Sequence, residues 1–242
     1  MRLLDEKKKA LKAAFPVTIP VMTGYLFIGV AYGMLMTSRG YAPGWSILMS
    51  LFVYAGSMQF VAVNFFAGTV NWITIIFVTF MVNIRHVFYG LSMLTKFRDM
   101  GRKKPYMIFS LTDETFSLLC SANAPKGVSQ NRFLFFIALL DQLYWVAGSV
   151  LGGIAGSLVP FNTKGIDFAM TALFVVIFVE QWQSCENHLP AVAGVASSLL
   201  CLIVFGASNF ILPSMVVIVL ILTASYRRPK AAGKMEDGEE NG

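Results

Sequence analysis

The sequence predicts an all-α polytopic membrane protein, with about six full transmembrane helices and two broken or re-entrant helical elements. Of its 242 residues, 56% are apolar and only 13% are charged, whereas a soluble globular chain carries roughly a quarter charged residues. Most of the chain must therefore face something other than water. None of the apolar segments shows the alternation of a membrane β-barrel, so the predicted class is α-helical.

Seven apolar runs are long enough to cross about 30 Å of hydrocarbon, which takes about 20 helical residues. We expect residues 1–15 to form a cytoplasmic or interfacial segment, 16–226 a transmembrane domain and 227–242 a disordered cytoplasmic tail. A shorter apolar run, 106–120, carries two acidic residues. The seven longer runs are 16–36, 45–67, 70–94, 133–159, 166–183, 188–208 and 209–226.

The basic residues favour one membrane orientation. Five of the 19 Lys and Arg lie in the first 12 residues, five between Lys96 and Lys104, and four between Arg227 and Lys234. Such residues favour the cytoplasmic side. If every run crossed the membrane, the second cluster would lie outside. If 45–67 and 106–120 instead return to the face that they entered from, all three clusters and both termini are cytoplasmic, so the rule favours re-entry.

The composition of these two segments favours the same arrangement. Residues 45–67 are interrupted at Ala55-Gly56-Ser57, where glycine makes a break easy, and 106–120 is too short for a comfortable crossing. Two broken elements that enter from opposite faces are typical of transporters with inverted repeats, so an inverted repeat is an open alternative. An ordinary helix that contains one glycine is the alternative for 45–67.

Polar groups at membrane depth are unfavourable unless they are partnered or functional, so each is a candidate site residue. The first cluster is YAGSMQF (54–60). A half-helix that starts at Ser57 would point its N-terminal N–H groups at an anion. Gly56 would free backbone groups, and Gln59 supplies a donor and an acceptor. Tight helix packing through small residues is the alternative.

The second cluster is NIRHVFYG (83–90). Asn83 and His86 are three residues apart and share a helix face, and Arg85 and Tyr89 share a neighbouring one. Arg85 could bind a carboxylate through two parallel hydrogen bonds, and His86 could relay a proton. The alternative is that Arg85 extends to the cytoplasmic interface.

The third cluster is LTDETFSL (111–118). Adjacent acids in an apolar segment do not both stay ionised without partners. One of Asp113 and Glu114 could pair with Arg85 while the other binds an ammonium group or a proton. Alternatively, Thr112 and Asp113 cap a short helix, which would explain one acid but not both.

The fourth cluster is DQLYWVAGSVLGG (141–153), followed by Gly156. Asp141 shares a helix face with Tyr144 and Trp145, and it is a candidate proton-coupling residue. The glycines at 148, 152 and 156 form a smooth stripe that favours close helix packing over a binding role.

Several classes of function are disfavoured. The basic clusters are separated by long apolar stretches, so we expect contact with membrane lipid headgroups and no binding of nucleic acid. Glu180, Cys185, Glu186 and His188 resemble a metal-ligand set, but with two His in the chain no catalytic zinc site assembles. We therefore expect no metal, no cofactor and no enzymatic activity.

The four clusters together resemble the signatures of the AzlC family, the large subunit of branched-chain amino acid exporters. The order, the spacing and the length fit over about residues 12–225. The commoner form of the first motif is F-A-G-S-A-Q-F, and here Tyr54 and Met58 replace Phe and the second Ala. The resemblance implies proton-coupled export of leucine, isoleucine, valine and also methionine across the cytoplasmic membrane. It also implies a small AzlD-like membrane partner.

We hypothesise that the amino acid binds near the membrane midplane. Its carboxylate would meet the half-helix at Ser57 with help from Arg85, and its ammonium group would meet Asp113 or Glu114. An aromatic pocket would take the aliphatic side chain, whose burial contributes roughly 2 kcal/mol. The competing hypotheses are a non-transporting scaffold or assembly subunit and a passive solute channel.

Overall fold

The computed structural model describes residues 2–68, 71–158 and 187–206, residues 210–226, and scattered positions between 168 and 183. All regular structure in these residues is helical, which confirms the predicted α class. Three of the helices are long and apolar enough to cross a membrane. The chain divides into two compact units, Met1–Val175 and Val176–Gly242.

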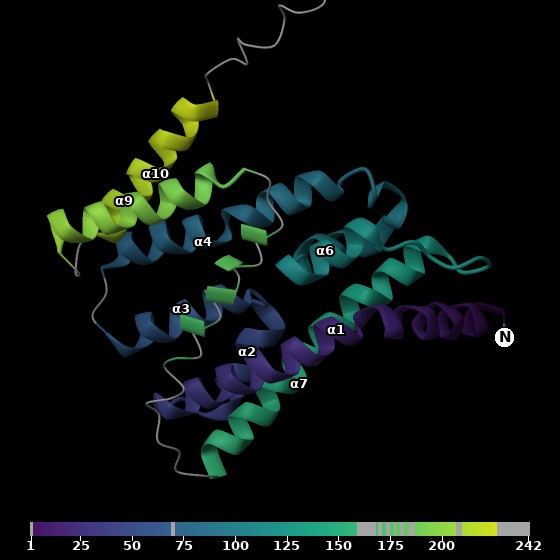
Figure 1. The fold of residues 1–242 in the computed structure, drawn as a ribbon. Helices are drawn as coiled ribbons and strands as arrows, with labels where there is room; N and C mark the ends of the chain where they lie inside the picture. The colour runs from purple at the N-terminus through teal and green to yellow at the C-terminus, as the bar shows by residue number, and fades with distance from the viewer. Residues whose placement is uncertain are drawn as a thin grey trace, which may run out of the picture. The chain divides into compact units, whose positions relative to one another are not determined.

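Helices α1 (Arg2–Ser38) and α7 (Gln130–Leu158) pack along each other in the first unit (Figure 1). They run in the same direction, because early residues of one meet early residues of the other and late residues meet late ones. Parallel packing means that the chain between them must cross the unit, from the end at which α1 finishes back to the end at which α1 begins. The pairs that set this direction are Glu6 with Arg132, Thr18 with Tyr144, and Thr37 with Gly156.

The glycine stripe of α7 allows this close contact. A Cβ added to Gly152 would overlap the backbone of Val30 in α1, and one added to Gly148 would lie 2.9 Å from the backbone oxygen of Leu26. Only a residue without a side chain fits at these points, because the two backbones touch there. The packing interpretation of the stripe agrees with this geometry.

The first helix has no boundary near residue 16, where the sequence suggested that an interfacial segment would give way to the first span. It continues through Pro16 and Pro20 for 37 residues. At 1.5 Å per residue this is about 55 Å, against about 30 Å of hydrocarbon. Part of α1 must therefore extend beyond the apolar layer.

The segment expected at 45–67 is broken. Helix α2 (Pro43–Phe52) and helix α3 (Gly56–Ala67) are separated by three residues, and Tyr54 between them has a φ of 45°, a conformation that is strained for a non-glycine residue. The hydroxyl of Tyr41, just before α2, donates to the backbone oxygen of Phe66 near the end of α3, at 3.1 Å. The two helices therefore start and finish at the same end of the unit.

The segment expected at 106–120 is also broken. Helix α4 (Trp72–Met93) leads through a 3₁₀ helix at Arg98–Lys103 into α5 (Lys104–Phe109), and three residues then separate α5 from α6 (Asp113–Ser121). This second pair of helices also returns to the end from which it starts, because Lys96 Nζ donates to two backbone oxygens at the end of α6. The acceptors are Leu119, at 2.5 Å, and Cys120, at 3.1 Å.

The two broken segments enter from opposite ends of the unit, and their breaks approach each other beside α7. The rings of Tyr54, in the first break, and Phe109, just before the second, lie 6.2 Å apart. Gln142 of α7 connects both regions: its Nε2 donates to the backbone oxygen of Leu51 at 3.2 Å, and its Oε1 accepts from the Tyr106 hydroxyl at 2.8 Å. The start and the end of each broken segment are thus placed by contacts within the first unit.

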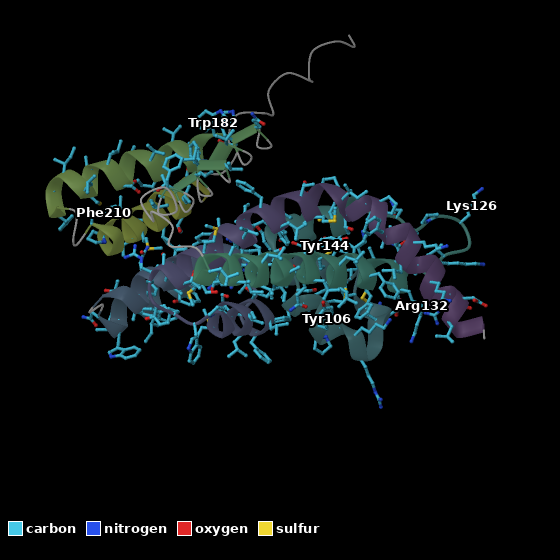
Figure 2. The ribbon with its side chains drawn as sticks, turned by 90° about the horizontal axis from the view of Figure 1, so that it is seen from below. Tyr106, Lys126, Arg132, Tyr144, Trp182 and Phe210 are labelled. Atoms are coloured by element: carbon cyan, nitrogen blue, oxygen red, sulfur yellow. The ribbon has the colours of Figure 1, made fainter. Side chains whose placement is uncertain are left out.

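One end of this unit gathers basic residues from three parts of the sequence. Figure 2 shows Lys126 and Arg132 together there. For these parts to share an end, the chain must cross the unit an even number of times between them. This is expected if 45–67 and 106–120 each return to the end from which they start. The contacts that join them are Arg132 with Glu6, Asn131 Nδ2 with the Asp99 backbone oxygen at 3.0 Å, and Lys103 Nζ at 4.3 Å from the centre of the Phe135 ring.

Buried apolar residues form a core toward the same end, between α1, α7 and the segments that follow α4. This core fixes the short helices α5 and α6 against α7, which carries the fully buried Leu134 and Ile137. The other fully or almost fully buried members are Ala14, Phe97, Met107, Leu111, Leu119, Phe133 and Ala138.

The second unit contains α9 (Leu189–Phe205) and α10 (Ile211–Tyr226), which pack against each other. They match the runs expected at 188–208 and 209–226. Gly206 ends α9 with a φ of 72°, a conformation that favours glycine. Half of the run expected at 166–183 and all of the tail expected at 227–242 lie outside the described residues.

Candidate functional site

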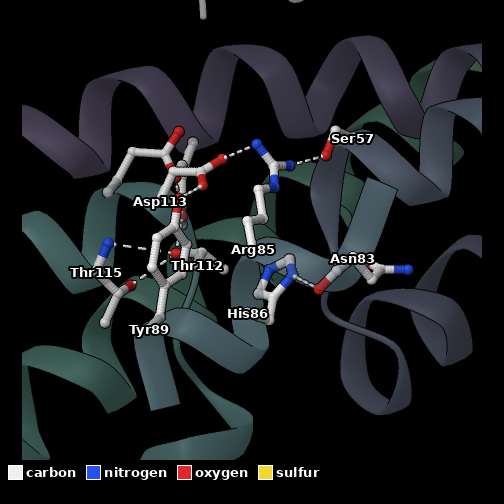
Figure 3. Close-up of polar contacts among 10 residues, drawn as sticks. Ser57, Asn83, Arg85, His86, Tyr89, Thr112, Asp113 and Thr115 are labelled. Carbon is white, nitrogen blue, oxygen red and sulfur yellow. Dashed lines mark hydrogen bonds and ion pairs between the residues drawn. The ribbon is translucent and has the colours of Figure 1, made fainter. Parts of the chain in front are cut away.

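Arg85 lies between the starts of the two half-helices (Figure 3). Its guanidinium donates to the hydroxyl of Ser57 in the first turn of α3. Its Nη1 also lies 2.7 Å from Asp113 Oδ2 in the first turn of α6. One side chain of α4 therefore connects the two places where the helices are interrupted, at a point where both charged groups are about a quarter exposed.

Arg85 has donor capacity left. Its Nε is buried and has no hydrogen-bond partner among the residues that the structure describes. A guanidinium has five N–H donors in a planar fork that matches a carboxylate. The side chain could therefore accept an anionic group without first losing all its present partners.

Asp113 is held by a second donor. The Tyr89 hydroxyl donates to Asp113 Oδ1 at 2.6 Å, and the Tyr89 ring stacks on Phe116 with centroids 4.4 Å apart. Arg85 and Tyr89 are four residues apart on α4 and thus reach the same carboxylate from one helix face. Thr112 caps α6 as the alternative interpretation suggested, but Asp113 is used in the ion pair.

Glu114 points to a different helix. Its Oε2 accepts from the Tyr25 hydroxyl of α1 at 2.7 Å, and the same hydroxyl lies 2.5 Å from Thr112 Oγ1. The two adjacent acids therefore contact different partners, Asp113 on α4 and Glu114 on α1. This separation explains how both can occupy one turn.

Asp141 is fully buried in α7. Its Oδ2 accepts from the Thr115 hydroxyl at 2.9 Å, and Thr115 in turn accepts from the Thr112 hydroxyl at 3.0 Å. Its Oδ1 has no hydrogen-bond partner in the described part of the chain. Although Asp141 shares a helix face with Tyr144 and Trp145, its hydrogen bond is to α6, while Tyr144 bonds Thr18 and Trp145 donates to Gln59.

Gln59 and Gly56 contact α7 where the first break meets it, although Gly56 directly precedes Ser57 in the chain. Gln59 is fully buried, and it accepts from Trp145 Nε1 at 2.9 Å and donates to Ser50 Oγ at 3.2 Å. A Cβ on Gly56 would lie 3.2 Å from the Trp145 ring. In this conformation both residues serve packing, so a substrate could reach Gln59 only by displacing its protein partners.

Asn83 and His86 are close to each other, and their hydrogen bonds are to backbone oxygens of their own helix. The Asn83 side chain donates to the backbone oxygen of Thr79, and His86 Nδ1 lies 3.2 Å from the Asn83 backbone oxygen. The His86 ring meets the edge of the Tyr89 ring with centroids 5.8 Å apart. Tyr89, which contacts the His86 ring, also donates to Asp113 and therefore lies between the two.

Tyr25 is the functional candidate that the sequence analysis did not identify. It and Tyr32 are seven residues apart on α1, both are buried, and both rings contact Trp145, with centroids 5.5 and 6.1 Å away. Two tyrosines at this spacing inside an apolar run place two hydroxyl groups on one helix face. This spacing is the sequence signal from which Tyr25 could have been predicted.

Of the four residues that resemble a metal-ligand set, His188 alone belongs to the part of the chain that the structure describes. Within the described residues no three potential ligands group together. Glu180, Cys185 and Glu186 lie outside those residues, and the His188 ring stacks on Trp182 with centroids 4.2 Å apart.

Comparisons with known proteins give a consistent result. A family model described as AzlC protein matches residues 20–159. The branched-chain amino acid transport protein AzlC of Bacillus subtilis is 50% identical over 220 residues, covering 91% of this chain and 86% of that protein. An uncharacterized membrane protein of Helicobacter pylori is 42% identical over 90% of this chain and 96% of its own length.

A more distant relative is the inner membrane protein YgaZ of Escherichia coli, which is 30% identical over 70% of this chain and 72% of its own length. No solved structure matches the chain significantly.

Proposed function

Because the chain belongs to the AzlC family, we propose that it is a carrier subunit that exports branched-chain amino acids. Leucine, isoleucine and valine are the proposed substrates, with methionine as a further candidate. The Bacillus subtilis relative is named a branched-chain amino acid transport protein, and the function is transport without chemical conversion. The observation that carries the proposal is Arg85, which joins Ser57 and Asp113 at two helix breaks.

The ion pair suggests how a zwitterion binds. The substrate carboxylate takes the position beside Arg85 and the first turn of α3, where helix N–H groups carry partial positive charge. The substrate ammonium group takes Asp113 or Glu114. If the ammonium group binds Asp113, Arg85 exchanges the Asp113 carboxylate for the substrate carboxylate and Asp113 exchanges the guanidinium for the ammonium group, so no unpaired charge is left at membrane depth.

Aromatic side chains near the ion pair provide an environment for the aliphatic part of the substrate. Tyr89 and Phe116 stack beside Asp113, and Tyr54 and Phe109 lie at the two breaks. Burying a leucine-sized side chain contributes roughly 2 kcal/mol. This favours leucine over glycine but separates leucine weakly from isoleucine or methionine, which agrees with broad branched-chain selectivity.

The topology that we propose has about six full spans, with α2–α3 and α5–α6 re-entrant from opposite faces. The parallel packing of α1 and α7, and the shared end of the basic clusters, support it. The basic end is cytoplasmic by the positive-inside rule, so the N-terminus is cytoplasmic, and the same rule places the C-terminus there. An inverted repeat and a cytoplasmic (inner) membrane location belong to the same proposal, and the Escherichia coli relative is named an inner membrane protein.

Proton coupling and a small AzlD-like partner subunit complete the proposal. His86, Asp113, Glu114 and Asp141 are the candidate proton carriers. The partner rests on the family resemblance. A non-transporting scaffold would need only packing, whereas a site with an ion pair and several hydroxyl groups at two helix breaks favours a carrier.

Counterflow of labelled leucine in proteoliposomes, with and without the AzlD-like partner, tests the proposal. A carrier exchanges internal unlabelled leucine for external labelled leucine and shows a transient overshoot. A scaffold gives no exchange, and a passive channel gives equilibration without overshoot. A protonophore then separates coupled from uncoupled accumulation, and a panel of amino acids defines the substrate range.

A further inference from the structure

A line of hydroxyl groups connects the partly exposed Glu114 to the buried Asp141. From Glu114 Oε2 it passes through Tyr25, Thr112 and Thr115 to Asp141 Oδ2. We refer to these five residues as the hydroxyl relay. The four oxygen-to-oxygen distances along it are 2.7, 2.5, 3.0 and 2.9 Å.

The number of protons in the relay is restricted. Its four contacts each need one proton to be a hydrogen bond, and its three hydroxyl groups supply three. The Tyr25 hydroxyl contacts both Glu114 and Thr112 but can donate to only one of them. With both carboxyl groups ionised, one contact would therefore join two oxygens with no proton between them. A fourth proton, carried by one of the two carboxyl groups, supplies the missing hydrogen bond.

The burial of the relay residues also favours one protonated carboxyl group. Asp141 and Thr115 are fully buried, and Tyr25 and Thr112 are almost so. No ion pair to Asp141 occurs among the residues that the structure describes, and an isolated ionised carboxylate is strongly unfavourable in such surroundings. Glu114 is the member with partial exposure, so it is where a proton can enter from water.

We infer that Glu114 and Asp141 share a single transferable proton through the hydroxyl groups of Tyr25, Thr112 and Thr115. With the proton on Glu114, each group donates to the next along the relay and Thr115 donates to the Asp141 carboxylate. When each hydroxyl passes its proton one step onward, Glu114 becomes a carboxylate and Asp141 becomes a neutral acid. Each of the three hydroxyl groups gives up one proton and gains another. The net change is that one O–H bond is lost at Glu114 and one is formed at Asp141, so the total charge is unchanged.

The relay gives the proposed transport a coupling step, and this role rests on that proposal. An ammonium group bound beside Glu114 favours its carboxylate form, which drives the proton to Asp141. Substrate and proton therefore compete for one group. Three phenols are also close enough to interact electrostatically with the two carboxyls, Tyr54 and Tyr106 with Asp141, and Tyr54 and Tyr89 with Glu114. Asp113 and Arg85 form the adjacent ion pair.

The test uses two relay variants and two matched controls. Tyr25→Phe and Thr115→Val each remove one relay hydroxyl with little change in volume. Tyr144→Phe and Thr18→Val remove hydroxyls that bond each other at 3.1 Å between α1 and α7, outside the relay. Leucine counterflow and leucine-induced proton movement, the latter with a pH dye inside the vesicles, are measured for all four and for the parent chain.

We expect both relay variants to lose leucine-induced proton movement. Thr115→Val, which does not contact the proposed substrate groups, should retain counterflow, and the controls should retain both activities. Unchanged proton movement in Tyr25→Phe and Thr115→Val would overturn the inference. Counterflow without proton movement in the parent chain would overturn it as well, while leaving amino acid transport in place.

A second readout does not depend on transport. The infrared spectrum of the purified protein should contain the carbonyl band of a neutral carboxyl group, which Asp141→Asn or Tyr25→Phe removes or shifts and Asp99→Asn leaves unchanged. Absence of that band, or its insensitivity to both relay variants, would overturn the shared proton. A parent chain without counterflow for any amino acid contradicts the proposed function, and the infrared result still decides the relay.

Discussion

Arg85 Nη1 lies 2.7 Å from Asp113 Oδ2, and this ion pair joins α4 to the first turn of α6. Both side chains are partly exposed, and pairs of that kind contribute little to stability. The pair instead keeps two opposite charges side by side next to a helix break. This arrangement suits a ligand that itself carries one charge of each sign.

Replacing Asp113 with Asn should abolish leucine counterflow while the protein stays inserted in the membrane. The amide keeps the shape but removes the charge that pairs with Arg85 and that could bind an ammonium group. Asp99→Asn, in the basic loop, is the control and should retain activity. Full transport by Asp113→Asn would remove this acid from the mechanism.

Replacing Arg85 with Lys should weaken substrate affinity. Lysine keeps the positive charge but loses the planar fork that binds a carboxylate through two hydrogen bonds. A hydrogen bond to a charged group contributes about 1.5–3 kcal/mol, so the concentration for half-maximal transport should rise roughly 10- to 100-fold. Arg98→Lys should behave like the parent chain, and equal affinities in the two variants would contradict a role for the guanidinium.

Replacing Gly152 with Ala should destabilise the α1–α7 pair. The added Cβ would overlap the Val30 backbone, and overpacking of this kind typically costs about 1–3 kcal/mol. Gly24→Ala is the control, because a Cβ there meets nothing within 4 Å. Thermal unfolding in detergent compares the two; an unchanged midpoint for Gly152→Ala would indicate that the helices do not pack as described.

The shared end of the basic clusters predicts a labelling pattern. In a chain whose three cysteines are replaced by serine, single cysteines at Lys8, Arg102 and Lys126 should react with an impermeant maleimide from the same side of the membrane. A cysteine at Arg39, at the other end of α1, should react from the opposite side. Labelling of positions 8 and 102 from different sides would contradict the re-entrant arrangement.

The sequence was sufficient to predict the two breaks and the residues around them. Gly56 marked the first, and the shortness of 106–120 marked the second. The four-residue spacing of Arg85 and Tyr89 also predicted that they share one face of α4. These features depend on residues near one another in the chain, so composition and spacing report them.

The contacts of Tyr25 and Gln59 could not be predicted in the same way. Tyr25 meets Glu114 only because α1 packs beside α6, and Gln59 meets Trp145 only because the first break lies against α7. Each contact joins residues more than 80 positions apart. The parallel packing of α1 and α7 decides these partners, and no local pattern specifies the partner of a helix face.

A binding cycle between protein and ligand tests the central claim most directly. Leucine and 4-methylpentanoate, which lacks the amino group, are each titrated into the parent chain, Asp113→Asn and Glu114→Gln. If the ammonium group binds one of these acids, that variant should lose affinity for leucine by about tenfold or more and bind 4-methylpentanoate almost unchanged. Equal losses for both ligands in both variants would show that neither acid recognises the ammonium group, and the proposed binding site would be wrong.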